Sequence, residues 1–271
     1  MEKAKVLYIS QEIQPYNAER TISKVARYLP EYVKENTDKD VRLFMPKYGT
    51  INERRYQLHE VIRLSGINMV IDDVDYPLII KVASVPEAKM QVYFMDNEEL
   101  FSRKSDLGDD KTPFFADNDT RMAFFCQGVL ETINKLGWIP DVIHCHGWMT
   151  SIIPAYIKKN YADEPVFKNA KIVFSAYNNM GGELNSALAS KAVKGDVTMN
   201  ELSMIAEPTW ENLTKFAAKW SDGVVLCSEN NVMEDYFEKN KISYIKDTST
   251  EDYEVVNGFY DRVLAFDPVL S

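Results

Sequence analysis

The stretch Pro140-Asp-Val-Ile-His-Cys-His-Gly-Trp-Met-Thr-Ser-Ile-Ile-Pro-Ala-Tyr-Ile157 decides the fold. Its first part is a short apolar run, which predicts a buried strand over residues 141–144. A polar turn with two histidines follows, and the apolar residues beyond it predict a helix from about residue 150 to 161. A buried strand that leads through a short turn into a helix is typical of α/β proteins.

The same alternation of strand and helix extends in both directions from this stretch. Apolar runs predict further strands at residues 5–10, 41–46, 79–82, 91–95, 171–176 and 223–228. Helical spacing predicts helices at residues 21–34, 117–137 and 231–240, and a possible short helix at 184–192. Residues 102–115 and the remainder of 181–201 are predicted as long exposed loops.

Several of the predicted strands are apolar throughout, which favours a mostly parallel sheet covered on both faces. The sequence therefore predicts an α/β fold, a Rossmann-like doubly wound sheet. Ligands of such sheets bind at the carboxyl ends of the strands. Here those ends are the segments that follow Ser10, His144, Ala176 and Ser228.

Composition restricts the classes of function. A formal charge of -10 argues against nucleic-acid binding, because neutralising phosphates needs a surplus of Lys and Arg. No apolar run approaches the roughly 18–20 residues of a membrane span. The charged N-terminus lacks a signal-peptide core, and three cysteines in apolar segments suit reduced thiols, so a cytoplasmic location is expected.

No metal or cofactor is expected from the sequence. Side chains alternate across a strand, so Cys145 should point away from His144 and His146 and leave no three-ligand cluster. The loop after residue 177 contains two glycines but is too irregular for a dinucleotide fingerprint.

The central stretch resembles the "PDVIHCHDWHT…PAYL" signature of bacterial glycogen synthases and plant starch synthases, glycosyltransferase family 5. Four further motifs follow the family's order. They are Met45-Pro-Lys-Tyr-Gly49 (family "MPRYG"), Asp117 to Phe125 ("DNxxRFAFF"), Lys171 to Asn178 ("KxVFTIHN"), and Val256 to Asp261 with Phe266-Asp-Pro268 ("NGID…WNP").

The resemblance implies the N-terminal half of a two-domain GT-B glycosyltransferase that uses ADP-glucose. Residues 1–271 are then expected to form a single domain that ends at the interdomain hinge, about residues 256–271. The second Rossmann domain, which carries the family's diphosphate-binding lysine and arginine, is expected to be absent.

The chain departs from the family at positions that the resemblance marks as functional. The family's "KTGGL" loop aligns with Ala18-Glu-Arg-Thr-Ile22, so its lysine is Ala18 and its glycines are Arg20 and Thr21. A phosphate cradle needs a bare backbone, which these residues do not offer. The acidic residue of the HDWH turn aligns with Gly147, and the histidine of "HN" with Tyr177. No catalytic residue is therefore expected to remain.

Some residues at the strand ends remain candidates for ligand binding. They are Arg20, His146, Trp148, Tyr177 and Asn178. Trp148 suits stacking on a sugar, but packing between the turn and the next helix is the favoured interpretation. Arg20 is expected to fill the former nucleotide space.

His144 is expected to be a buried, hydrogen-bonded core residue, and Glu12 has no partner that the sequence identifies.

The favoured hypothesis is a catalytically deficient glycogen synthase-like domain that binds a glucan or plays a regulatory or partner role. Its partners would be a glucan or sugar nucleotide, another protein, or further copies of itself. The alternative is an active glucosyltransferase assembled with a separate chain that supplies the nucleotide-binding domain. A different activity on the same scaffold also stays open, since a fold does not fix a function.

Overall fold

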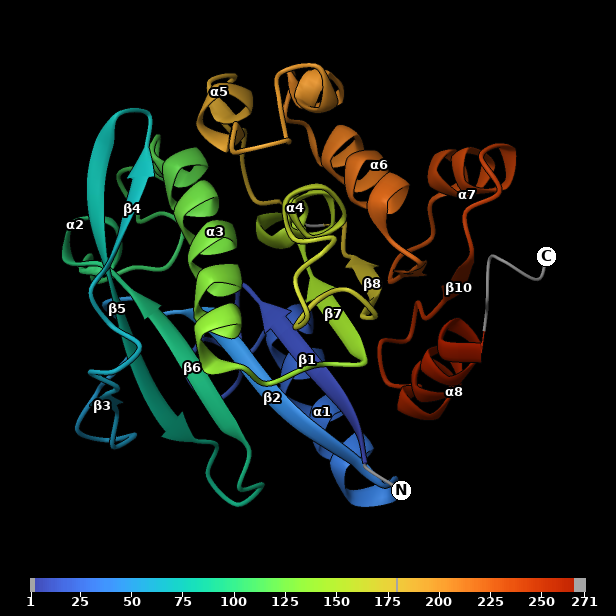
Figure 1. The fold of residues 1–271 in the computed structure, drawn as a ribbon, viewed down its shortest axis with the longest axis horizontal. Helices are drawn as coiled ribbons and strands as arrows, with labels where there is room; N and C mark the ends of the chain where they lie inside the picture. The colour runs from blue at the N-terminus through green and yellow to red at the C-terminus, as the bar shows by residue number, and fades with distance from the viewer. Residues whose placement is uncertain (1–2, 179, 266–271) are drawn as a thin grey trace.

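The computed structural model describes residues 3–178 and 180–265. Its centre is a sheet in the order β10-β9-β8-β7-β1-β2-β6-β5-β3, with β4 paired to β5 (Figure 1). The strands are β1 (Ala4–Ser10), β2 (Lys39–Pro46), β3 (His59–Glu60), β4 (Ile67–Ile71), β5 (Val74–Ser84), β6 (Gln91–Asp96), β7 (Val142–His146), β8 (Lys171–Ala176), β9 (Gly223–Leu226) and β10 (Tyr244–Lys246).

The sheet is mostly parallel and doubly wound, as the sequence predicts. Strand β1 lies between β2 and β7 and is parallel to both. The chain builds β2 and β6 on one side of β1, and then β7, β8, β9 and β10 on the other. Among the strands of the described residues, antiparallel pairing is confined to β5 at one margin, which pairs in this way with β3, β4 and β6. The order therefore reverses between β1 and β7.

Helices cover both faces of the sheet. They are α1 (Thr21–Asn36), α2 (Glu98–Phe101), α3 (Asn118–Leu136), α4 (Ile153–Asn160), α5 (Leu188–Ala192), α6 (Trp210–Trp220), α7 (Asn231–Lys239) and α8 (Tyr253–Ala265), with 3-10 turns η1 (Trp148–Thr150) and η2 (Glu201–Ile205). In Figure 1, α3, α4 and α6 lie in front of the strands, and α1 lies behind them. Helices α1 and α8 are in contact with each other on that second face.

Most of the predicted elements are confirmed. The helix expected at 117–137 is α3, and Gly137 closes it in the left-handed conformation with φ 65°. A left-handed C-cap is the usual role of a glycine just after a helix. The segment 102–115 is a loop, but the expectation that it is exposed is wrong in part, because Asp106 and Phe115 are buried.

The predicted hinge begins inside a helix. Val256, Phe259, Tyr260 and Val263 are buried and form the inner stripe of α8. Their spacing of three and four residues is that of one helix face. Residues 266–271, the rest of the predicted hinge, lie outside the described residues, and so does the Phe266-Asp-Pro268 motif.

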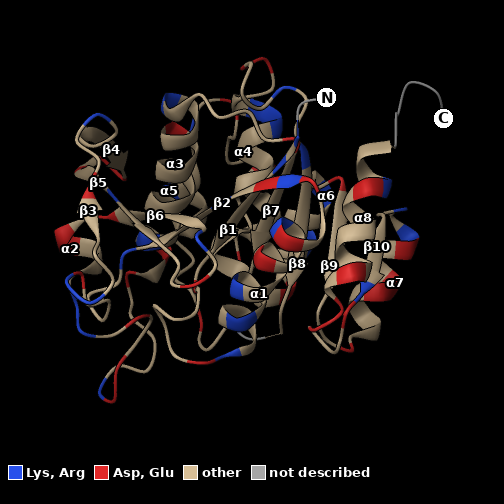
Figure 2. Ribbon diagram, turned by 90° about the horizontal axis from the view of Figure 1, so that it is seen from below, with Lys and Arg blue, Asp and Glu red and all other residues tan. Residues whose placement is uncertain are grey.

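Charged residues of both signs lie mainly on helices and loops, and the central strands are mostly uncharged (Figure 2). Among residues 3–178 and 180–265, no helix is long and apolar enough to cross a membrane.

Candidate functional site

The carboxyl ends of β1 and β7 meet at the point where the strand order reverses. Ser10, the last residue of β1, lies beside His146, the last residue of β7. Loops diverge from neighbouring strands at such a point and leave a crevice in open α/β sheets. The strand ends at which the sequence predicts a site are therefore those from which β1 and β7 lead the chain to opposite sides of the sheet.

A buried polar cluster lies directly under this edge. The rings of His144 and His146 are 3.9 Å apart, because alternate residues of β7 face the same side. His144 Nδ1 lies 2.6 Å from the Tyr260 hydroxyl, and its Nε2 lies 2.8 Å from Ser175 Oγ. The expectation that His144 is a hydrogen-bonded core residue is confirmed.

His146 and Tyr177 come together, but inside the protein. His146 Nδ1 lies 2.9 Å from the Tyr177 hydroxyl, and both residues are buried. No hydrogen-bond partner reaches His146 Nε2 from the described part of the chain. Burial lowers the pKa of His146 to about 3 and that of His144 well below its usual value, so both imidazoles are neutral near pH 7.

Gly147 occupies a conformation that other residues rarely adopt. Its φ is 80° and its ψ is 171°. A Cβ added here would lie 2.5 Å from Ile22 Cδ1 and 2.7 Å from Gln11 Oε1. The first turn of α1 and the loop after β1 thus fill the space into which a side chain at position 147 would project.

Arg20 lies in the loop between β1 and α1 and contacts two carboxylates. Its Nη1 lies 3.0 Å from Glu12 Oε1, and its Nη2 lies 3.7 Å from Asp106 Oδ2. Glu12 also accepts a hydrogen bond of 3.2 Å from Gln11 Nε2. Glu12, for which the sequence identifies no partner, therefore has two in the structure. Burial raises the pKa of Glu12, and the nearby Arg20 opposes that rise.

Asp106, the second carboxylate near Arg20, is also hydrogen-bonded to two other segments. It accepts a hydrogen bond of 3.1 Å from Asn17 Nδ2 and one of 2.7 Å from Thr50 Oγ1. Arg20, itself half-exposed, is held between two buried carboxylates. Positive charge at this crevice is consequently neutralised by the protein itself.

The last two candidates lie apart. Trp148 is 2% exposed and its ring lies 5.7 Å from that of Phe114. Trp148 thus packs inside the protein rather than offering a face for a sugar. Asn178 is exposed, directly after the buried Tyr177. Of the five candidates, only Arg20 and Asn178 present substantial surface.

The described residues contain no group of three or more His, Cys, Asp or Glu side chains that could hold a metal ion. Cys145 faces away from the histidines, as predicted, on the side of the sheet where Cys126 Sγ donates to the Met149 carbonyl. Both thiols are buried, and burial raises the pKa of each.

Three residues that shape the site were not anticipated from the sequence. They are Gln11, Ile22 and Asp106. Gln11 directly follows a predicted strand end, and this position could have identified it as a site residue from the sequence. Asp106 lies in the middle of a charged loop, where nothing local indicates a contact with Arg20.

Fold and site together define a doubly wound α/β domain of the kind found in GT-B glycosyltransferases. The profile of the family "Starch synthase catalytic domain" matches residues 5–240, so the chain belongs to that family.

Two curated relatives carry the name glycogen synthase. That of Chlorobium phaeobacteroides is 39% identical over 179 residues, 64% of this chain and 36% of the relative. That of Chlorobium chlorochromatii is 40% identical over 180 residues, 65% and 36% respectively. The match thus covers about a third of the length of these relatives.

A solved structure supports the fold. The catalytic domain of starch synthase IV from Arabidopsis thaliana, bound to ADP and acarbose, superposes with a TM-score of 0.73 at 18% identity. The superposition covers 90% of this chain and 51% of that one.

Proposed function

We propose that this chain is a glycogen synthase-like domain that transfers no glucose itself and acts by binding a glucan or a protein partner. The family assignment supplies the context, since relatives that share 39% identity are named glycogen synthases. The strand-end crevice of this chain, however, differs from the one that the resemblance to glycogen synthases implies.

One observation carries the proposal. Side chains of the chain itself occupy the crevice, because Arg20 bridges Glu12 and Asp106 while Ile22 and Gln11 crowd the position of Gly147. Glucosyl transfer from a sugar nucleotide relies on groups aimed at the departing diphosphate. A cation already neutralised by two carboxylates offers little to that charge.

The polar groups that remain give limited support to sugar binding within the crevice. His146, Trp148 and Tyr177 are all buried. The aromatic rings of Trp148 and Tyr177 therefore present no exposed face on which a sugar ring would stack. Asn178 is the exposed amide among the five candidates. A glucan would therefore contact the rim, and a sugar nucleotide would need the Arg20 bridge to open.

Calorimetric titration of the chain with ADP-glucose and with malto-oligosaccharides tests the proposal. We expect no saturable heat with ADP-glucose for the wild type. Arg20→Gly, which restores the family residue, should enlarge the crevice without producing transfer. Saturable binding of ADP-glucose by the wild type would contradict the proposal and favour the alternative of an active enzyme completed by a second chain.

A further inference from the structure

Strand β4 has one free edge. It pairs with β5 through the turn Asp72–Asp73, whose residues both have positive φ, 52° and 60°. Two such residues form the two-residue hairpin turn in which the flanking pair, here Ile71 and Val74, exchanges hydrogen bonds. Bonded and non-bonded pairs then alternate along the hairpin.

This alternation fixes where the free backbone groups point. Asn68 is paired with Pro77, which has no N–H to donate, and so falls in a non-bonded pair as the turn requires. The N–H and C=O groups of Asn68 and Val70 therefore point away from β5. No turn, loop or cap within residues 3–178 and 180–265 bonds to them.

The residues of β4 itself carry none of the usual protection against pairing. Sheets commonly guard edge strands with lysine, proline, bulges or inward charges. The sequence of β4, Ile-Asn-Met-Val-Ile, contains neither charge nor proline, and Val70 is 56% exposed.

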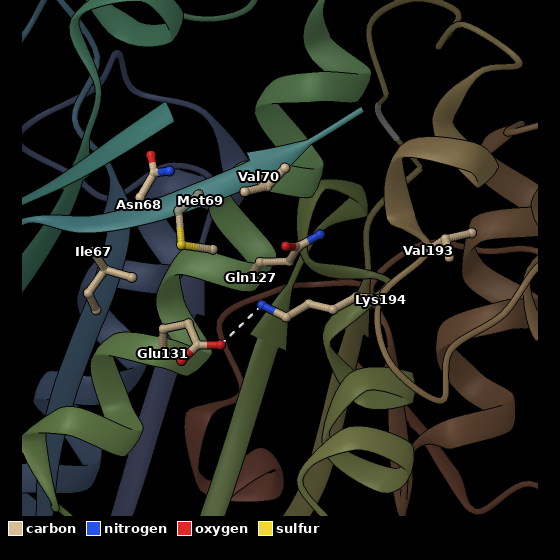
Figure 3. Close-up of a pocket in the computed structure, with 8 residues that line it drawn as sticks. All are labelled: Ile67, Asn68, Met69, Val70, Gln127, Glu131, Val193 and Lys194. Atoms are coloured by element: carbon tan, nitrogen blue, oxygen red, sulfur yellow. Dashed lines mark hydrogen bonds and ion pairs between the residues drawn. The ribbon is translucent and has the colours of Figure 1, made fainter. Parts of the chain in front are cut away.

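A groove of about 310 Å³ runs beside this edge (Figure 3). It is lined by Ile67, Asn68, Met69, Val70, Gln127, Glu131, Val193 and Lys194. Lys194 is paired with Glu131 across its floor, so the groove presents a neutral polar base and exposed valines at its rim.

We propose that the occupant is a second copy of this chain, paired β4 to β4 in antiparallel fashion about a two-fold axis at Met69. In this register Asn68 of each copy faces Val70 of the other, and both are residues whose N–H and C=O point outward. Each of these pairs is then a bonded pair. The strand is complementary to itself, as a two-fold interface requires.

Charge outside the strand favours the same register. Continuing the antiparallel pairing carries the Asp72–Asp73 turn of one copy toward the segment before Gly66 of the other, which contains the exposed Arg63. Within the described part of the chain, no ion pair engages Arg63, Asp72 or Asp73. Opposite charges at the two ends of the interface thus meet across the axis.

The proposal is independent of the state of the strand-end crevice, because β4 lies beside β5 near one margin of the sheet, whereas the crevice lies at β1 and β7 in its middle. A short strand pair and one groove make a small interface, and interfaces below about 1,200 Å² total are typical of weak association. We expect a dissociable dimer that forms as the concentration rises.

Sedimentation velocity of the full chain over a hundredfold range of concentration is the first test. The wild type should move from monomer to dimer, and Val70→Lys should stay monomeric. Val232→Lys is the matched control, since Val232 is 57% exposed on α7, at the opposite side of the molecule (Figure 1). That variant should dimerise like the wild type.

Two outcomes would overturn the proposal. One is a wild type that is monomeric throughout, as expected if the edge instead takes an extended peptide from another protein. The other is an equal effect of Val70→Lys and Val232→Lys.

A second test addresses the register. Bonded pairs place Cα atoms about 5.5 Å apart, within the range of about 4.4–6.8 Å that a disulfide spans. A mixture of Asn68→Cys and Val70→Cys chains, oxidised in air, should form a cross-linked dimer. Each variant alone should form much less, and the wild type, with its native cysteines, should form none. A mixture that cross-links no better than the separate variants would overturn the register.

Discussion

The guanidinium of Arg20 lies 3.0 Å from the carboxylate of the buried Glu12, and a second carboxylate, that of Asp106, lies 3.7 Å away. This contact joins the loop after β1 to the loop before α3. It also places a neutralised cation where the family loop, by resemblance, keeps bare glycine backbone. Two experiments on stability follow from the geometry around it, and a third follows from the histidines beneath.

Removing the guanidinium should destabilise the fold through the carboxylate that it leaves behind. Arg20→Ala removes the cation from the buried Glu12 carboxylate and leaves Gln11 as the donor to Oε1, and a lost hydrogen bond to a charged group costs about 1.5–3 kcal/mol. We expect the free energy of unfolding in urea to fall by that order at pH 7. The loss should shrink at lower pH, because burial raises the pKa of Glu12 and the carboxyl is then protonated more readily.

A double variant and a surface pair serve as controls. Arg20→Ala with Glu12→Gln should regain much of the loss, since the neutral amide needs no cation. Lys24→Ala, which breaks an exposed pair with Glu19, should cost less than about 1 kcal/mol. If Arg20→Ala and Lys24→Ala lower the free energy of unfolding equally, the Arg20–Glu12 contact stabilises the fold no more than an exposed ion pair does.

Introducing at position 147 the acidic residue that the resemblance implies should damage the fold rather than produce chemistry. Gly147→Asp and Gly147→Ala both place a Cβ 2.5 Å from Ile22 Cδ1 at a φ of 80°. Backbone strain in this region costs about 1–3 kcal/mol before any crowding is counted. We expect both variants to lower the midpoint of thermal unfolding markedly.

Gly137→Ala is the matched control, because Gly137 also has positive φ but a Cβ there meets nothing within 4 Å. It should cost only about 1–2 kcal/mol, the ordinary penalty of the left-handed conformation. A Gly147→Ala variant as stable as Gly137→Ala would mean that the crevice has room for a side chain.

Stability should fall as the pH drops below about 6.5, the ordinary pKa of histidine. Burial lowers the pKa of His146 to about 3 and that of His144 well below its usual value. Between about pH 6.5 and the folded-state pKa, the unfolded chain binds protons that the folded chain refuses. Each histidine then removes up to about 1.4 kcal/mol of unfolding free energy per pH unit.

Urea unfolding between pH 7 and pH 5 measures this slope, and that window lies above the pKa range of most carboxyls. His146→Gln should reduce the slope. The raised pKa of Glu12 acts in the opposite direction, since a group that binds its proton more tightly when folded loses stability as the pH rises. A wild-type slope equal to that of His146→Gln would contradict the account.

The parts of the fold that the sequence predicts are those with local patterns. Strands β1, β7 and β8 are almost entirely buried, and their sequences are mostly apolar. Helix α3 carries a stripe of apolar residues and is closed by Gly137. Helix α6 was missed although Thr209 accepts a hydrogen bond from Asn212 N at its start, as an N-cap does. Helix α8 is likewise indicated by its helical apolar spacing, whereas the hinge predicted at about residues 256–271 rests on the resemblance alone and stays a prediction.

The site is less predictable because its contacts join distant segments. The alternation of a strand places His144 and His146 on one face, and the sequence shows this. The pairing of Arg20 with Asp106 depends on how a long loop folds back over β1, and no residue pattern encodes it. The sequence also does not predict how exposed these side chains are. Trp148 and Tyr177 are residue types that often line sugar-binding pockets, but the segments around them bury both.

Incorporation of radiolabelled glucose from ADP-glucose into glycogen tests the central claim most directly. The chain would be assayed alone and mixed with the separately produced C-terminal part of the Chlorobium phaeobacteroides glycogen synthase, with that intact enzyme as the positive control. Circular dichroism of the same sample would establish that the chain is folded. We predict incorporation no greater than that of an enzyme-free control in both assays. Incorporation well above that control, by the chain alone or in the mixture, would contradict the claim that its own side chains have closed the site.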